Sequence, residues 1–211
     1  MVDEDKVWKE PISTFMQYCL ALENKDYARA FSLEPRYMQK AAGSVKVYKG
    51  WWSSSAEHDK WRQLYAGMKI RKVEILTPKR VAILIDLPDE RMANVAFYMI
   101  HEDGKWKVGC FKLIFMHAKT DLERLNDAIV HYNEKKKRLP AELSVLTPEY
   151  IEELPSDLFN DKMEPYRYAK EVNGNYIIYS FGPDSDDDLG MVEYDYEKGL
   201  FNNGDIIIRS Q

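Results

Sequence analysis

The sequence is short of the features that would point directly to a chemistry. Its two cysteines, Cys19 and Cys110, lie far apart and in no metal-ligand spacing, so we expect two buried free thiols unless the fold pairs them. Its four histidines are scattered, which argues against a zinc site. It has no Gly-x-Gly-x-x-Gly, no P-loop and no Gly-x-Ser-x-Gly motif, so the common nucleotide-binding and serine-hydrolase signatures are absent.

Long apolar runs and a strong positive charge are missing too. No stretch approaches the roughly 20 apolar residues that span a bilayer, so we expect no membrane span in this chain. The net charge is −5 with both signs mixed, so we expect no nucleic-acid binding, which usually needs a basic face. No signal peptide is recognisable, but Met1-Val2-Asp3 leads into a polar segment, as after a removed leader. The expected location is therefore extracytoplasmic or in the cell envelope, with the cytoplasm left open.

What is present suits one or two folded domains. The 211 residues are 45% hydrophobic and 13% aromatic, which is too apolar for disorder. Residues 7–33 have helical spacing with a break at residues 24–26. Residues 33–55 show little periodicity, and Trp51-Trp52 is expected in a loop or at the start of a helix through 57–67.

The period then changes to that of strands. Four β-rich runs follow: Ile70–Leu76, Arg80–Leu87, Asn94–His101 and Trp106–Phe115. Asp103-Gly104 predicts a tight hairpin between the last two. Helices followed by an antiparallel meander predict an α+β fold, in which a curved sheet wraps on helices.

This order resembles the nuclear transport factor two-like superfamily, whose fold is a cystatin-like α+β cone. The resemblance rests on residues 26–31 (DYARAF) and 101–108 (HEDGKWKV), and predicts a first domain at residues 1–117. Some members of that superfamily are enzymes with an acid in the cone. The resemblance therefore leaves open an alternative function, a small hydrolase or isomerase. Its acid or base would be Asp86 or His101, which could also act together as an acid–base pair.

The second half begins with an amphipathic helix at residues 118–137, whose apolar residues repeat at spacings of three and four. Pro140 ends it, and Thr147-Pro148-Glu149 predicts a short second helix. Tyr166–Ala169 and Asn175–Phe181 are expected strands joined by a turn at Asn173-Gly174, and Ile206–Arg209 is the last strand.

These parts resemble the globular region of type II secretion major pseudopilins, over residues 118–211. The matching signatures occur in the family's order: Leu139-Pro140, Leu154-Pro155-x-Asp157, Pro165-Tyr166-x-Tyr168, Tyr176-x-x-Tyr179-Ser180-x-Gly182-Pro183-Asp184 and Gly204-Asp205-Ile206. The hydrophobic N-terminal half-helix of a pseudopilin is absent here, and the cone-like domain precedes the helix instead. The resemblance predicts a pseudopilin-like helix and small antiparallel sheet after the cone.

The resemblance also implies a calcium site in the aspartate-rich loop. It assigns the carboxylates of Asp184 and Asp205 as ligands, with the carbonyls of Phe181 and Asp186 as further candidates. Asp187 or Asp188 would replace a carboxylate supplied later in the family's loop.

Elementary electrostatics points the same way, because four crowded aspartates repel one another unless a cation or water intervenes. An EF-hand is excluded, since Leu189 stands where that loop needs glycine. The alternative is a solvated Asp-rich turn without an ion.

Together these patterns predict a non-enzymatic binding or assembly module with a structural Ca²⁺ and a protein partner. Two other functions stay open: the hydrolase or isomerase described above, and a regulatory interaction protein of the cytoplasm.

Overall fold

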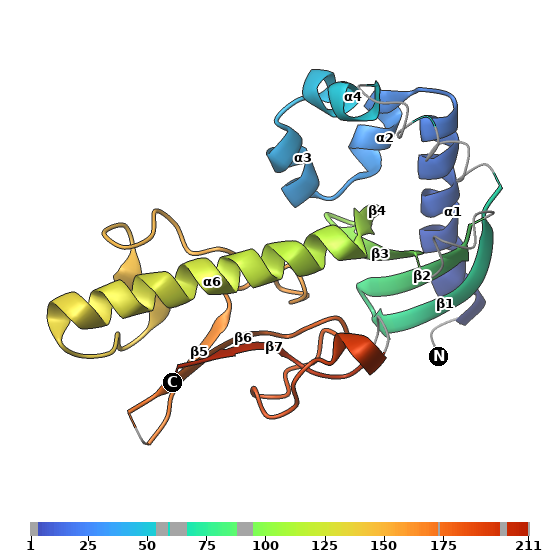
Figure 1. Cartoon of the computed structure of the whole chain (residues 1–211). Helices are drawn as coiled ribbons and strands as arrows, with labels where there is room; N and C mark the ends of the chain where they lie inside the picture. The colour runs from blue at the N-terminus through green and yellow to red at the C-terminus, as the bar shows by residue number, and fades with distance from the viewer. Residues whose placement is uncertain are drawn as a thin grey trace. The chain divides into compact units, whose positions relative to one another are not determined.

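The computed structural model describes residues 4–53, 59, 67–87, 95–172, 174–198 and 202–210, with side chains from residue 9 onward. It contains helices and two antiparallel sheets, which confirms the α+β class (Figure 1). The chain divides into two compact units, Met1–Phe111 (unit 1) and Lys112–Gln211 (unit 2). The expected division at residues 1–117 and 118–211 stays a prediction, as do both family resemblances.

Unit 1 begins with four helices: α1 Glu4–Glu23, α2 Tyr27–Leu33, α3 Arg36–Ala42 and α4 Val45–Ser53. The predicted break at residues 24–26 is present, because Lys25 is left-handed (φ 59°) and Asp26 caps α2 by accepting from Arg29 N at 3.0 Å. Within the segment 33–55, the described residues 33–53 are more regular than their weak periodicity predicted. Trp51 and Trp52 end α4 instead of lying in a loop, and the helix expected through 57–67 falls mostly outside the described residues.

The unit 1 sheet is an antiparallel meander in chain order: β1 Lys69–Thr77, β2 Arg80–Asp86, β3 Val95–Glu102 and β4 Lys105–Cys110. Asp103 (φ 50°) and Gly104 (φ 75°) form the predicted hairpin turn, which needs two left-handed residues. The predicted end of the fourth strand at Phe115 is wrong, because β4 stops at Cys110 and residues 111–115 are helical. A strand pattern and a helix face look alike over so short an apolar run.

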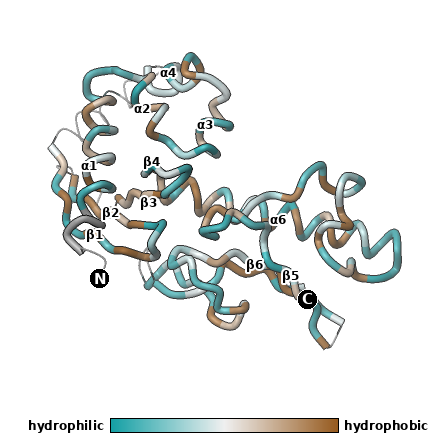
Figure 2. Tube along the Cα trace, turned by 180° about the vertical axis from the view of Figure 1, so that it is seen from behind, coloured by the Kyte–Doolittle hydropathy of each residue, from teal (hydrophilic) through white to brown (hydrophobic). Residues whose placement is uncertain are grey.

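The core of unit 1 lies between α1 and one face of this sheet. Phe15 and Leu22 of α1 are fully buried in one cluster with alternate residues of β2, Val81 and Ile83. The rings of Phe15 and Phe97 are 4.7 Å apart. Figure 2 shows hydrophobic stretches in β2 and β3, as expected of strands covered on at least one face.

Unit 2 is built on the long helix α6, Phe111–Lys136, and the sheet β5 Arg167–Lys170, β6 Tyr176–Ser180, β7 Ile206–Arg209. The predicted apolar face of α6 is buried, but the helix begins seven residues before the predicted start at Ala118. The described residues of the unit also form two 3₁₀ turns, Leu143–Leu146 and Tyr196–Lys198. The short helix expected to open at Thr147–Glu149 is wrong: the 3₁₀ turn precedes it, and residues 147–150 form a turn.

Hydrogen bonds join α6 to the segments of the sheet. Tyr176 Oη donates to Asn126 Oδ1 at 2.7 Å, and Tyr166 Oη to Asp121 Oδ2 at 3.4 Å. Across the part of the chain that the structure describes, no helix combines the length and apolarity that a bilayer span requires.

Candidate functional site

The aspartate loop starts from a buried anchor, Asp157. Its Oδ1 accepts hydrogen bonds from Ser180 Oγ at 2.8 Å and Phe159 N at 3.0 Å, and its Oδ2 accepts from Phe181 N at 2.9 Å. Asp157 is 1% exposed, so these donors stand in for the water that the charge has lost. The anchor fixes Phe181, whose carbonyl is one of the predicted ligands. The sequence marked Asp157 only as part of a resemblance and gave no sign of this role.

Asp184 connects the two ends of the loop. Its Oδ2 accepts from Gly204 N at 3.0 Å, and its Oδ1 from Asp186 N at 3.4 Å. Backbone contact at this junction is so close that a Cβ on Gly182 would lie 2.0 Å from the Gly204 carbonyl oxygen. The fold thus brings Asp184 next to Gly204-Asp205, which is 20 residues away in the chain, as the predicted site requires.

Asp205 is fully buried, and only one of its oxygens is satisfied. Oδ2 accepts from Gly190 N at 2.7 Å, whereas Oδ1 has no hydrogen-bond partner. Burial, together with the charges of Asp188 and Asp187, raises the pKa of this carboxyl to about 7. Backbone N–H groups of Gly190 and Asp188 act in the opposite direction. A buried carboxylate with an unused oxygen is destabilising unless something positive or donating reaches it.

The four clustered aspartates are not equivalent. Asp188 Oδ2 is buried with no hydrogen-bond partner, like Asp205 Oδ1. Asp187 is engaged by the protein, since its Oδ1 accepts from Tyr179 Oη at 3.1 Å and its Oδ2 lies 3.6 Å from Arg167 Nε. Asp186 is exposed, and its Oδ1 accepts from the N–H of Asp187 at 3.0 Å. Of the two alternatives that the sequence left open, Asp188 therefore has the free acceptor.

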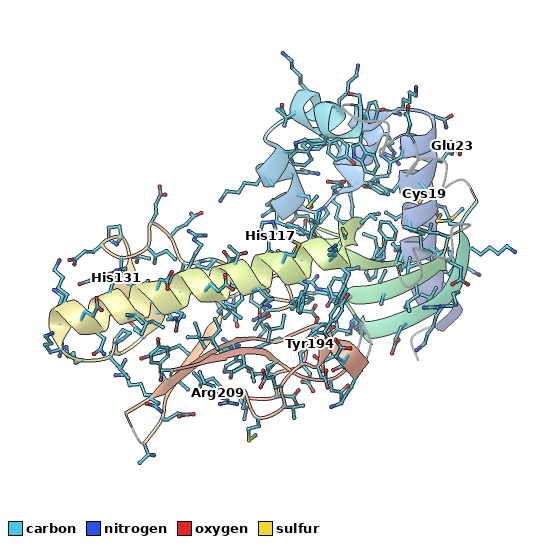
Figure 3. All side chains as sticks on the ribbon, viewed as in Figure 1. Cys19, Glu23, His117, His131, Tyr194 and Arg209 are labelled. Atoms are coloured by element: carbon cyan, nitrogen blue, oxygen red, sulfur yellow. The ribbon has the colours of Figure 1, made fainter. Side chains whose placement is uncertain are left out.

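The far side of the loop is tied down by other contacts. Arg209 Nη2 donates to the Gly190 carbonyl at 2.6 Å, and Tyr194 N donates to the Asp205 carbonyl at 2.8 Å. The Tyr194 ring packs on Phe115 of α6 at 5.5 Å. Figure 3 labels Arg209 and Tyr194 along this side of unit 2. The loop is thus held at several points by the protein.

The carboxylate and carbonyl oxygens of the aspartate loop are ligands of the type that a hard cation prefers, but the side chains alone do not surround an ion completely. Within the described ranges, no group of three or more His, Cys, Asp or Glu side chains is placed to hold a metal ion. Calcium also accepts carbonyl and water oxygens, so two carboxylates with the nearby backbone carbonyls are a chemically suitable donor set. Burial raises the pKa of Asp184, and Asp188 raises it too, which a bound cation would reverse.

The acid–base pair of the alternative function is not formed. The strand register places Asp86 opposite Lys69 at one end of β2, while His101 N donates to the Lys79 carbonyl just before the other end. Seven residues of strand separate the two ends, roughly 23 Å. Asp86 is exposed and 3.6 Å from Arg71, and His101 packs on Trp106 with 5.1 Å between ring centroids.

The remaining candidates are also separate. Cys19, which is buried, and Cys110, which is half-buried, are not joined in a disulfide, so the disulfide alternative is not realised. His58 lies outside the described residues. His117 and His131 lie on distant turns of α6 (Figure 3).

A second buried carboxylate, Glu34, was not indicated by the sequence. It is 3% exposed, and its Oε1 accepts from Tyr48 Oη at 2.7 Å and Tyr18 Oη at 2.9 Å, while Oε2 has no hydrogen-bond partner. Burial raises the pKa of Glu34 to about 7, against the two hydroxyls, which lower it. A glutamate before a proline reads as an ordinary loop residue, so only the packing reveals it.

Comparison of the chain with protein-family models, with curated proteins and with solved structures found no match.

Proposed function

We propose that this chain is a non-enzymatic binding or assembly protein whose C-terminal unit is stapled by a structural calcium ion. The proposal includes the pseudopilin-like character of residues 118–211, the cone-like character of residues 1–117, and a location outside the cytoplasm or in the cell envelope. The observation that supports it best is the pair of buried, unpartnered oxygens, Asp205 Oδ1 and Asp188 Oδ2, in one loop.

The proposed ligands are the carboxylate of Asp205, that of Asp184 or Asp188, and the carbonyls of Phe181 and Asp186, since no three of the described carboxylates are gathered to hold one ion. When bound, calcium would supply positive charge where buried carboxylates repel each other. It would also link the turn after β6 to the segment before β7, which opposes loop-closure entropy. Asp187 supports the site indirectly, because Tyr179 and Arg167 occupy its oxygens.

A protein partner is proposed because the loop exposes apolar side chains that a purely structural turn does not need. Leu189 is 63% exposed and Met191 is 76% exposed, and both come directly after the clustered aspartates in the chain. Exposed apolar side chains that lie together mark interaction sites, and methionine is enriched at interfaces.

The test is thermal unfolding of the full chain in excess Ca²⁺ and in chelator, followed by far-UV circular dichroism at pH 7.5. A site that binds only the folded chain adds about 2.7 kcal/mol when calcium is one hundred times its Kd. All five tryptophans lie in residues 8–106, so tryptophan fluorescence reports the surroundings in unit 1 and provides an internal comparison.

Asp205→Asn makes the test specific. It should abolish the calcium-dependent shift, and in chelator it should leave stability unchanged or raise it, because it removes a buried unpaired charge. Asp127→Asn, which changes an exposed carboxylate of α6, should keep the full shift. A wild-type protein, loaded with calcium and shown to contain it, that melts at the same temperature after chelation would rule out the site.

A further inference from the structure

One pocket of unit 1 gathers positive charge although the chain is acidic overall. It has a volume of about 860 Å³ and is lined by residues of α1, the α2 helix and the β3–β4 hairpin. Its cationic side chains come from these three elements: Lys9, Arg29, Lys105 and Lys107. Glu10 is the acid among the described residues that line it, which gives a formal charge of +3 against −5 for the whole chain. We call this site the cationic pocket.

Hydrogen bonds hold two of these cations in place without neutralising them. Arg29 Nη2 donates to Gln17 Oε1 at 2.6 Å, and Lys107 Nζ donates to the Ser32 carbonyl at 2.6 Å. Both acceptors are uncharged, so each cation keeps its charge and has further N–H donors to offer. The three elements that meet here therefore present positioned donors to the pocket.

The acids beside the pocket are directed elsewhere. Glu102 Oε2 accepts from Arg36 N at 3.0 Å, and Asp103 Oδ2 lies 2.5 Å from Arg36 Nη2, at the start of α3. Burial lowers the pKa of Lys107, and neighbouring cations add to this effect, whereas Glu102 and Asp103 oppose it. Within the described residues, none of the four pocket cations forms an ion pair with a carboxylate.

The rest of the lining is mixed. Ser13, Thr14 and Ser32 add hydroxyl groups, and Leu33 and Trp106 add an apolar side. The Trp106 ring is held edge-on against His101, with centroids 5.1 Å apart. A ligand that fits this lining carries a compact anionic group and an uncharged part that packs on an aromatic ring.

We propose that the cationic pocket binds a small organic phosphate. A phosphate monoester offers three acceptor oxygens and close to two negative charges, which match a guanidinium fork together with ammonium groups. A single carboxylate would leave most of the +3 charge unmatched. The volume is within the range of about 300–1,000 Å³ that small-molecule sites occupy. This inference concerns unit 1 and is independent of the calcium site proposed for unit 2.

The test is calorimetric titration of the full chain with phenyl phosphate at constant ionic strength, with sodium sulfate and phenol as comparison solutes. We expect saturable binding of phenyl phosphate, weaker binding of sulfate and no measurable binding of phenol. Arg29→Gln and Lys107→Gln should each weaken binding of phenyl phosphate by about tenfold or more, because each removes a charged donor. Lys46→Gln, which changes an exposed lysine of α4 outside the pocket, should leave it unchanged.

Three results would overturn the proposal. They are the absence of saturable phenyl phosphate binding, sulfate binding as tight as phenyl phosphate binding, and an equal loss in Lys46→Gln. The second would mean a general anion site, and the third would mean an effect of overall charge. Circular dichroism confirms that each variant is folded, and Lys105→Gln, in the exposed hairpin, replaces any variant that is not.

Discussion

Replacing Glu34 with glutamine should remove much of the pH dependence of stability in unit 1. The pKa of this carboxyl rises from its ordinary value of 4.5 to about 7, mainly through burial. Between these values the folded chain keeps a proton that the unfolded chain has released. The free energy of unfolding therefore falls as pH rises, it is highest below about pH 4.5, and the loss is complete above about pH 7.

The size of the effect follows from the shift. A difference of about 2.5 pH units corresponds to about 3 kcal/mol at 1.36 kcal/mol per unit. Glutamine has nearly the same shape and keeps an oxygen that accepts from Tyr18 and Tyr48, but it does not titrate in this range. From pH 5 to pH 8 we therefore expect the stability of Glu34→Gln relative to the wild type to rise by about 2.5 kcal/mol, because part of the full effect lies below pH 5.

The measurement is urea unfolding at pH 5, 6, 7 and 8, followed by tryptophan fluorescence, since every tryptophan lies in residues 8–106. The quantity compared is the difference between variant and wild type, which cancels other titrating groups. Glu23→Gln, at an exposed carboxylate of α1 (Figure 3), is the matched control and should show no such trend. A difference between Glu34→Gln and wild type that stays constant across the pH range would refute the argument that burial keeps this carboxyl protonated.

Two further predictions concern unit 2. Gly182→Ala should destabilise unit 2 by about 2 kcal/mol or more, because φ is +69° and the new Cβ would lie 2.0 Å from the Gly204 carbonyl oxygen. The control, Gly50→Ala in α4, should stabilise unit 1 by about 0.5 kcal/mol or more. Chemical denaturation followed by circular dichroism measures both changes, and equal effects of the two substitutions would contradict the contact at Gly182. Asp157→Asn should lower the free energy of unfolding by at least about 2 kcal/mol. The new amide nitrogen would face Ser180 Oγ or Phe181 N, which now donate to a carboxylate oxygen. Unchanged stability in the same assay would contradict the role of Asp157 as an anchor.

The secondary structure could be read from the sequence where the local signals agree. The alternating runs and the Asp103-Gly104 turn predicted the meander, and the three-four spacing predicted the buried face of α6, because period and turn chemistry are local properties. The predictions failed where a short apolar run is compatible with either a strand or a helix. Residues 111–115 have a strand-like composition, but the long helix continues through them since each added residue of a formed helix gains a hydrogen bond.

By itself the sequence determined an α+β protein and the loop in which a cation would be sought, because both follow from residue type and spacing. Only the tertiary structure decided which carboxylates are buried without partners: Asp205 and Asp188 have such oxygens, Asp187 does not, and Glu34 was unexpected. The same holds for the cationic pocket, whose charges come from three elements spread over about a hundred residues. Burial and convergence depend on contacts between distant segments, and these are set by the packing of the whole unit.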